Sequence, residues 1–313
     1  MPSSLKTFAV FLAVALSFGT AATVTHAQAT LPVTVVVTAL GPKYTPPPAL
    51  SKADIAVYES KTQRTVNSFT PAQGDRAVLQ LAIVIDDACT TELGIQLGDI
   101  KNFINAQPKT TAIGVFYASN GGVQATSPFS NDHEAAAKGV RIPFGNPGAY
   151  SSIFLSVMSL IDGWPAAGPG VRREILLIAD GIDRFRGDPF SPDVDSTYQK
   201  AEKAGVIIHS LYATGVGRAA HNSFRVNYGQ SNLAEITDKT GGEAFFQGLQ
   251  TPISFSPFLE QLDMILKNQY FLTWGTVASK KPKGELRNFK IKTEQKNVEI
   301  SSADQVFVPG GPK

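Results

Sequence analysis

The feature that most constrains the fold is a short apolar run that stops in two carboxylates. Residues 81–85 are Leu-Ala-Ile-Val-Ile, and Asp86 and Asp87 follow them directly. A continuous apolar run bounded in this way is typical of a strand buried on both faces, as in a parallel sheet covered by helices. Ligands of such sheets bind just beyond the carboxyl ends of the strands. We therefore expect Asp86 to lie at a binding edge.

After this run the sequence alternates between helix-like and strand-like segments. Strands separated by helices imply crossover connections, and Asn120-Gly121-Gly122 is a hairpin signal that adds one antiparallel partner. We predict an α/β fold with a doubly wound, mostly parallel, Rossmann-like sheet and one antiparallel edge strand. Further strands are predicted at 112–117, 123–129, 174–179, 206–212 and 244–246, and helices at 93–104, 132–140, 151–164, 193–204, 233–239 and 257–267.

Two β-patterned segments without helical periodicity flank the α/β region. Residues 31–69 contain three short strand-like runs, and residues 270–300 contain three more. Because these segments lie on either side of the α/β region in sequence, we predict that they pair into one small β-rich unit. The predicted organisation is a signal peptide at 1–29, an N-terminal β segment at 30–77, the α/β domain at 78–268 and a C-terminal β segment at 269–313.

The first 29 residues have the form of a secretory signal peptide. Lys6 precedes an apolar run from Phe8 to Phe18, and small residues follow up to Ala29. The apolar run is well short of the roughly 20 residues that a membrane-spanning helix needs. No later run reaches that length. We predict a secreted or periplasmic protein without a membrane span.

Composition excludes several classes of protein. With 43% hydrophobic and 17% charged residues, the 313-residue chain is neither disordered nor fibrous. The formal charge is +2, and it falls to +1 without Lys6, which gives no electrostatic basis for binding nucleic acid. Cys89 is the only cysteine, so the chain forms no internal disulfide. We interpret Cys89 as a packed residue, with a nucleophilic thiol as the alternative.

Oxygen-bearing side chains follow three predicted elements that a parallel sheet would bring together. Asp86 and Thr90 follow the first strand, Ser151 opens a helix, and Asp180 follows the strand at 174–179. Hydroxyl and carboxylate oxygens from separate loops are the ligands that a hard cation such as Mg²⁺ prefers. The sequence therefore indicates a candidate metal site at these four residues.

This order of residues resembles the von Willebrand factor A domain and its metal-ion-dependent adhesion site. The family pattern is Asp-x-Ser-x-Ser after the first strand, a threonine in a second loop, and an aspartate in a third. Asp86 and Asp180 match the two aspartates, while Thr90 and Ser151 match the second serine and the threonine conservatively. Ala88 departs from the pattern, because the family has a metal-binding serine there. Most of the mature chain also resembles a secreted branch of the family found in soil bacteria of the Acidobacteria type.

The resemblance implies a secreted, non-catalytic binding or adhesion module that engages a protein partner. It implies a divalent cation, Mg²⁺ or alternatively Mn²⁺ or Ca²⁺, whose open coordination position accepts an acidic side chain of the partner. The methyl group of Ala88 cannot be a ligand. Water would take that position, or a carboxylate from Asp87, Glu92 or Asp183 would supply it, or no metal binds.

A second hypothesis is a metal-independent structural or assembly protein with a vestigial site. In that case Thr90 and Ser151 are helix caps, and Asp180-Gly181 is a tight turn. The contacts would then come from a long loop predicted at 214–230. Its candidate partner-binding residues are of the types that anchor interfaces, namely Arg218, Phe224, Arg225 and Tyr228.

The least favoured hypothesis is a phosphatase-like hydrolase. The run Asp86-Asp87-Ala88-Cys89-Thr90 resembles the Asp-x-Asp-x-Thr loop of haloacid-dehalogenase-like phosphatases, in which the second aspartate is the general acid and base. Ala88 occupies that position, so the proton donor of this chemistry is missing. We therefore predict that the protein is not an enzyme.

Overall fold

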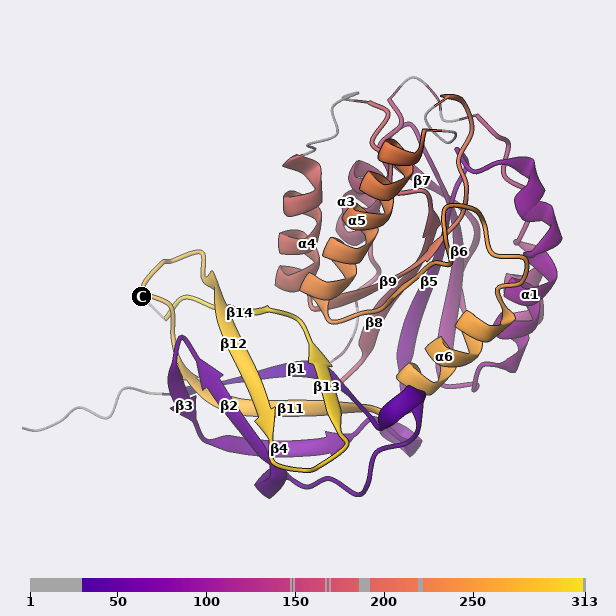
Figure 1. Ribbon diagram of the computed structural model, residues 1–313. Helices are drawn as coiled ribbons and strands as arrows, with labels where there is room; N and C mark the ends of the chain where they lie inside the picture. Colours follow the sequence, from indigo (N-terminus) through magenta and orange to yellow (C-terminus); the bar gives the residue numbers. More distant parts are fainter. Residues whose placement is uncertain are drawn as a thin grey trace, which may run out of the picture.

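The computed structural model describes residues 30–146, 148, 150–166, 168, 170–185, 192–218 and 222–311. The predicted signal peptide lies outside these residues. Figure 1 shows an α/β unit beside a smaller unit made of strands. Within the described part of the chain, no helix is both long and apolar enough to cross a membrane.

The α/β unit is built on a six-stranded sheet with the strand order β10-β9-β8-β5-β6-β7. Neighbouring strands are parallel, except that the edge strand β7 is antiparallel to β6. The prediction of a mostly parallel sheet with one antiparallel edge is confirmed. The strands are β5 (Leu79–Asp86), β6 (Thr111–Ser119), β7 (Gly122–Ser130), β8 (Arg172–Ala179), β9 (Val206–Tyr212) and β10 (Ala244–Phe245).

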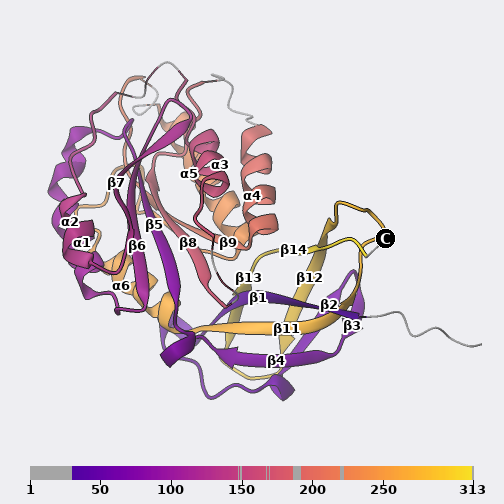
Figure 2. The same cartoon turned by 180° about the vertical axis from the view of Figure 1, so that it is seen from behind.

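Helices cover both faces of this sheet (Figure 2). Alternate residues of β5 point to opposite faces, so that Ile83 packs in one core with α1, α2 and α6, and Val84 in another with α3, α4 and α5. This is why residues 81–85 are apolar at every position. The helices are α1 (Leu97–Ala106), α2 (His133–Lys138), α3 (Ile153–Asp162), α4 (Pro192–Ala204), α5 (Ser223–Thr240) and α6 (Ser256–Lys267), with a 3-10 turn η4 (Thr91–Ile95) before α1.

The second unit consists of two antiparallel four-stranded sheets, with the orders β13-β1-β11-β4 and β14-β12-β2-β3. Both sheets combine strands from before and after the α/β unit, which confirms the predicted β-rich unit of N- and C-terminal segments. Buried Val37, Leu272 and Trp274 form part of its core. The strands are β1 (Thr30–Leu40), β2 (Ile55–Glu59), β3 (Thr62–Arg64), β4 (Val66–Pro71), β11 (Gln269–Val277), β12 (Glu285–Thr293), β13 (Glu299–Ser302) and β14 (Gln305–Val308), with 3-10 turns η1 (Pro42–Tyr44), η2 (Lys52–Asp54) and η3 (Gly74–Arg76).

The predicted long loop at 214–230 is wrong, because α5 begins at Ser223. The side chain of Asn222 accepts a hydrogen bond from the Arg225 backbone N–H and caps the helix. In the first half of α5, Gly229 and Gln230 are among the buried residues. Because neither has a large apolar side chain, the sequence there lacks the apolar periodicity that would predict a helix. The helix ends where predicted, since Gly241 adopts a left-handed conformation with φ of 80°.

Candidate functional site

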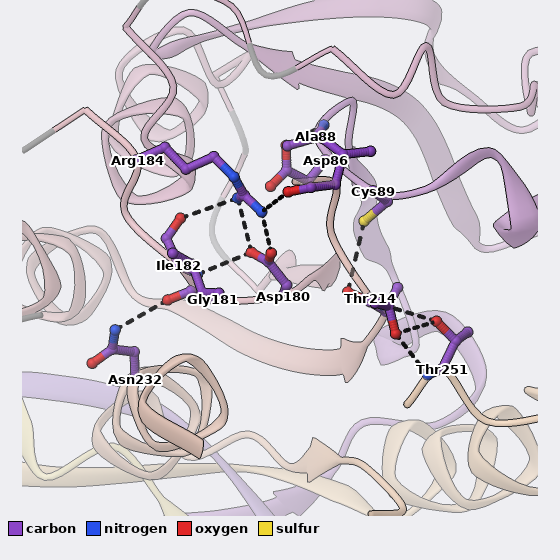
Figure 3. Close-up of polar contacts among 12 residues, drawn as sticks. Asp86, Ala88, Cys89, Asp180, Gly181, Ile182, Arg184, Thr214, Asn232 and Thr251 are labelled. Carbon is purple, nitrogen blue, oxygen red and sulfur yellow. Dashed lines mark hydrogen bonds and ion pairs between the residues drawn. The ribbon is translucent and has the colours of Figure 1, made fainter. Parts of the chain in front are cut away.

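Two carboxylates meet at the carboxyl edge of the parallel sheet. Strands β5 and β8 are hydrogen-bonded neighbours, and Asp86 and Asp180 stand at their ends. Both are buried, with 4% and 1% of their surface exposed. The Asp86 Oδ1 atom accepts a hydrogen bond from the backbone N–H of Ala88 at 2.8 Å. The two predicted aspartates therefore lie close together in the structure (Figure 3).

The guanidinium of Arg184 lies against the Asp180 carboxylate. Its Nη1 atom donates to Asp180 Oδ1 at 3.1 Å, and its Nη2 atom donates to Asp180 Oδ2. The same two nitrogens also reach the carbonyl oxygens of Ile182 at 3.4 Å and Val216 at 3.5 Å. Only 14% of the Arg184 side chain is exposed. Both Asp180 oxygens are thus engaged by a cation of the protein itself (Figure 3).

Glycines allow the loop after β8 to hold this pair. Gly181 adopts a left-handed conformation with φ of 70°. A side chain at Gly229 of α5 would come within 2.2 Å of the Asp180 carbonyl oxygen, and one at Gly215 would come within 1.9 Å of Asp180 Oδ2. The Nδ2 atom of Asn232 donates to the Gly181 carbonyl oxygen at 3.0 Å. The loop is therefore packed on α5 rather than free.

Burial and neighbouring charge shift the titration of Asp86. Burial raises its pKa most, and the charge of Asp180 raises it further, to about 7, while Arg184 and the Ala88 N–H act in the opposite direction. Burial acts to lower the pKa of Arg184, but the charge and hydrogen bonds of Asp180 and the charge of Asp86 outweigh it and raise that pKa. Arg184 accordingly remains charged, and Asp86 is close to its titration point at neutral pH.

Of the predicted supporting carboxylates, Asp87 is engaged by another partner. Asp87 forms a bidentate ion pair with Arg141, at 2.8 and 2.9 Å, and accepts from the Phe144 backbone N–H at 3.1 Å. Glu92 is exposed on η4. Asp183 is buried and accepts a hydrogen bond from the Phe185 backbone N–H at 3.0 Å.

Backbone hydrogen bonds position the two predicted hydroxyl ligands. Thr90 is half-buried, and its backbone N–H donates to the Thr214 carbonyl oxygen at 2.9 Å. Ser151 is buried, and its carbonyl oxygen accepts from the Arg184 backbone N–H at 3.1 Å. The alternative that Ser151 caps the helix is wrong, because Ser152 is the N-cap of α3 and accepts from the Leu155 N–H.

These residues do not fit a resident divalent cation as they are arranged. A metal ion of this kind needs several free oxygen ligands. Both Asp180 oxygens hold Arg184, Asp87 holds Arg141, and Ala88 offers only a methyl group. Among the described residues, no three Asp, Glu, His or Cys side chains are grouped so as to hold a metal ion.

Large apolar side chains are exposed around this edge. They lie in η4, in the segment 141–144 that hydrogen-bonds to Asp87, beside Ser151 and Arg184, and before α6. The Tyr150 and Phe185 rings are 5.5 Å apart, and the Ile253 carbonyl oxygen accepts from Gln96 Nε2 beside η4 at 3.3 Å. We name the set the apolar rim; its members, exposed between 43 and 94%, are Ile95, Ile142, Phe144, Tyr150, Phe185 and Ile253.

No family model matches the sequence. No curated protein matches it either. Among solved structures, a von Willebrand factor type A protein from Catenulispora acidiphila is 10% identical, with a TM-score of 0.45, covering 91% of this chain and 75% of that one. Manganese-loaded TRAP from Plasmodium vivax is 8% identical, with a TM-score of 0.42, covering 83% and 100%. A mussel byssus matrix protein, described as having a zinc-occupied MIDAS motif, is 14% identical, with a TM-score of 0.42, covering 64% and 48%.

The solved structures to which the chain is similar thus include a protein described as von Willebrand factor type A. This is the family that the sequence motif resembles. The sequence motif missed Arg184, although the residue stands only four positions after Asp180. It missed the apolar rim as well, since the rim residues are scattered over loops that come together only in the folded chain.

Cys89 is buried beneath the carboxyl edge of the sheet. Its Sγ atom lies 3.9 Å from the carbonyl oxygens of Ile178 and Ala213. Burial, and then the charges of Asp86 and Asp180, raise the pKa of the thiol well above its usual value. A thiol of this kind is a poor nucleophile, because the thiolate is the reactive form.

The predicted partner-binding residues lie at and before the start of α5. Arg218 and Arg225 are exposed, and Phe224 is 67% exposed. Tyr228 is half-buried. Three of the four thus remain accessible on the α/β unit, although they belong mainly to a helix rather than to the predicted loop.

Proposed function

We propose that the protein is a secreted, non-catalytic, adhesion-type module that engages a protein partner through the carboxyl edge of its parallel sheet. The observation that carries the proposal is the apolar rim around a buried pair of aspartates and an arginine. Large exposed apolar surfaces mark interaction sites on soluble proteins. Aromatic and arginine residues are also those enriched in the energetic centres of protein interfaces.

The residues around Asp87 support an interface of this kind. The Arg141 guanidinium lies over the Tyr117 ring at 3.6 Å and over the Phe144 ring at 3.8 Å. The Asp87 carboxylate accepts two hydrogen bonds from the Arg141 guanidinium and holds it in this position. The Phe144 side chain is therefore already ordered by its packing on Arg141. Less side-chain entropy of Phe144 would be lost when a partner binds it.

A non-catalytic role agrees with how the reactive groups are used. Asp180 is neutralised by Arg184, and Asp87 by Arg141. The thiol of Cys89 is buried and has a raised pKa. Ala88 leaves no general acid in the position that phosphatase chemistry needs. Hydrolysis of a generic phosphate ester that disappears in Asp86→Asn would contradict this part of the proposal.

The partner interface is tested with rim variants of the whole mature protein. Immobilised protein captures its partner from surface extracts of the producing organism, and mass spectrometry quantifies each captured protein. Phe144→Ser/Tyr150→Ser should reduce capture of a specific partner at least tenfold. Phe246→Ser is the matched control, since Phe246 is 42% exposed but lies beside Gly242 and Lys290. Equal capture by the rim variant and the control would remove the basis of the proposal.

The start of α5 is a second candidate surface, as in a metal-independent assembly protein. Its support is the exposure of Phe224 beside Arg225. Phe224→Ser/Arg225→Ser separates the two candidates. Loss of partner capture in this variant, with capture retained by Phe144→Ser/Tyr150→Ser, would favour the assembly role.

A metal-dependent form of the proposal has one structural requirement. A divalent cation shared by Asp86 and Asp180, with an acidic side chain of the partner as a further ligand, would have to displace Arg184 from Asp180. The hydrogen bonds from Arg184 to Asp180, Ile182 and Val216 oppose that exchange.

A further inference from the structure

Two buried carboxylates side by side create a demand for positive charge. Asp86 and Asp180 are almost fully excluded from water. Burying a charge without a partner is costly, and two like charges make the cost larger. The fold must therefore supply a cation at this place or keep a proton there.

The backbone around Arg184 is shaped to hold its guanidinium in that place. The Arg184 N–H is fixed to the Ser151 carbonyl oxygen at 3.1 Å, so its main chain is tied to the start of α3. A Cβ atom at Gly215 would come within 2.3 Å of Arg184 Nη2. The backbone of Gly215 pairs with that of Cys89 in an isolated antiparallel β-bridge, and Cys89 lies in the loop that follows Asp86. The segments around Ser151, Gly215 and Cys89 thus together form the buried position, or seat, of the Arg184 side chain.

We propose that Arg184 is a resident cation: its guanidinium, bonded to Asp180, takes the place of a divalent metal ion beside the two aspartates, and the centre is independent of metal. Ala88 fits this arrangement, because a guanidinium held by the Asp180 carboxylate and by carbonyl oxygens needs no hydroxyl ligand at that position. The departure of Ala88 from the family pattern and the presence of Arg184 then have one explanation.

The replacement also changes the chemistry of the partner. A divalent ion would neutralise both aspartates and offer an open coordination position to an acidic side chain. With Arg184 the centre keeps one negative charge whenever Asp86 is ionised, and both Asp180 oxygens are already bonded. An acidic side chain therefore gains nothing here, and the apolar rim provides the main contact. This consequence rests on the proposed function, whereas the resident cation itself does not.

The test measures Mn²⁺ binding to the purified mature protein, by the electron paramagnetic resonance signal of free Mn²⁺ and by thermal melting in EDTA or in MnCl₂. The wild type should show no saturable site and no shift of its melting temperature. Arg184→Gln should melt lower than wild type in EDTA, and Mn²⁺ should bind and raise its melting temperature. Adding Asp180→Asn to Arg184→Gln should abolish that response.

Arg225→Gln is the matched control, because it removes an exposed arginine elsewhere in the same unit. Saturable Mn²⁺ binding by the wild type would overturn the proposal, as would an Arg184→Gln variant that ignores Mn²⁺. If Arg184→Gln does not accumulate as folded protein, Arg184→Lys keeps a cation in place. It should fold in EDTA without any response to Mn²⁺, and a requirement for Mn²⁺ would contradict the proposal. None of these measurements needs the partner, so they are separate from the test of the apolar rim.

Discussion

The strand β8 carries a buried ionic cluster at each end, and the two clusters differ in what surrounds them. At its start, Arg172 and Glu174 meet His209 and Gln269. Just beyond its end, Asp180 meets Arg184 and Asp86. The first cluster is enclosed by regular secondary structure, and the second is held by loops beside the apolar rim. Ion pairs between buried side chains thus stabilise the fold at the start of β8, and beyond its end they lie at the edge where we propose that a partner binds.

The cluster at the start of β8 joins the two units of the molecule. Glu174 Oε2 accepts from His209 Nε2 at 2.9 Å, while His209 Nδ1 accepts from the Glu243 backbone N–H at 3.1 Å. Arg172 donates to the Ala77 carbonyl oxygen at 2.9 Å and to the Leu266 carbonyl oxygen at 2.8 Å. These two acceptors precede β5 and β11, where the chain passes between the units.

The largest expected effect comes from breaking this enclosed cluster. Glu174→Ala leaves Arg172 and His209 without their buried carboxylate, and removing one partner of a buried pair costs about 3–5 kcal/mol. Urea denaturation of the variant should show that loss of unfolding free energy. Glu134→Ala is the control, since its pair with Lys138 is exposed and its removal should leave stability unchanged. Similar midpoints for the two variants would contradict the assignment of Glu174 to a stabilising cluster.

A smaller loss is expected from Arg184→Gln in metal-free buffer. The variant leaves the buried Asp180 without its cation, but the Arg184 side chain is 14% exposed, so water can reach its place and replace some of the lost hydrogen bonds. We expect a cost of about 1.5–3 kcal/mol, the range for hydrogen bonds to charged groups. The measurement is again urea denaturation. A cost above that of Glu174→Ala would reverse the proposed order of the two clusters.

The cluster beyond the end of β8 should also make the free energy of unfolding depend on pH, through Asp86. The pKa of Asp86 rises from an ordinary value of 3.8 to about 7 on folding, mainly through burial. Between these values the folded state binds more protons than the unfolded state, so the free energy of unfolding contributed by Asp86 falls as pH rises toward 7. The slope for one proton is at most about 1.4 kcal/mol per pH unit.

Asp86→Asn isolates this effect, because the amide oxygen can still accept from the Ala88 N–H. Glu202 also has a pKa raised to about 7, mainly by burial, so the wild-type profile alone is not specific. The difference in stability between wild type and Asp86→Asn should shift in favour of the variant as pH increases. A difference that stays constant with pH would show that Asp86 does not titrate in this range.

The smallest expected effect is a change in the rate at which the Cys89 thiol is labelled. This rate reports how often the loops around Asp180 and Arg184 open in the native protein. The thiol is buried and has a raised pKa, so a thiol reagent should label the native protein far more slowly than the urea-unfolded chain. Arg184→Gln should accelerate native labelling, because the loops around Gly215 lose an anchor. Lys138→Ala should not. Equal labelling rates in all three proteins would mean that Arg184 does not hold this edge closed.

The sequence was sufficient to predict the sheet but only part of the site. The apolar runs before Asp86 and Asp180 locate β5 and β8, because burial on both faces leaves a continuous signal. The direction of a polar side chain leaves no such signal. Asp87 is adjacent to Asp86 but pairs with Arg141, which lies in a different loop. Only tertiary contacts distinguish the two carboxylates.

The same limit applies to Arg184. A basic residue after a turn is usually solvated, and nothing in its neighbours indicates a buried seat. That seat depends on Gly215, 31 residues later by its number in the chain, and on the bridge from Gly215 to Cys89. The start of α5 was missed for a related reason, because Gly229 is there to let the helix approach Asp180 rather than to fill a core.

The pairing of β1 with β11 has a mechanical consequence. Thr30 and Gly311, the first and last described residues, lie in or beside the β-rich unit, whereas the loops that follow β5 and β8 lie at the far edge of the α/β unit (Figure 1). A pull applied at that edge against a held terminus would reach the β-rich unit along two covalent connections, before β5 and after α6. Arg172 bonds to Ala77 in the first connection and to Leu266 in the last turn of α6, so one side chain links the two paths along which the force would travel.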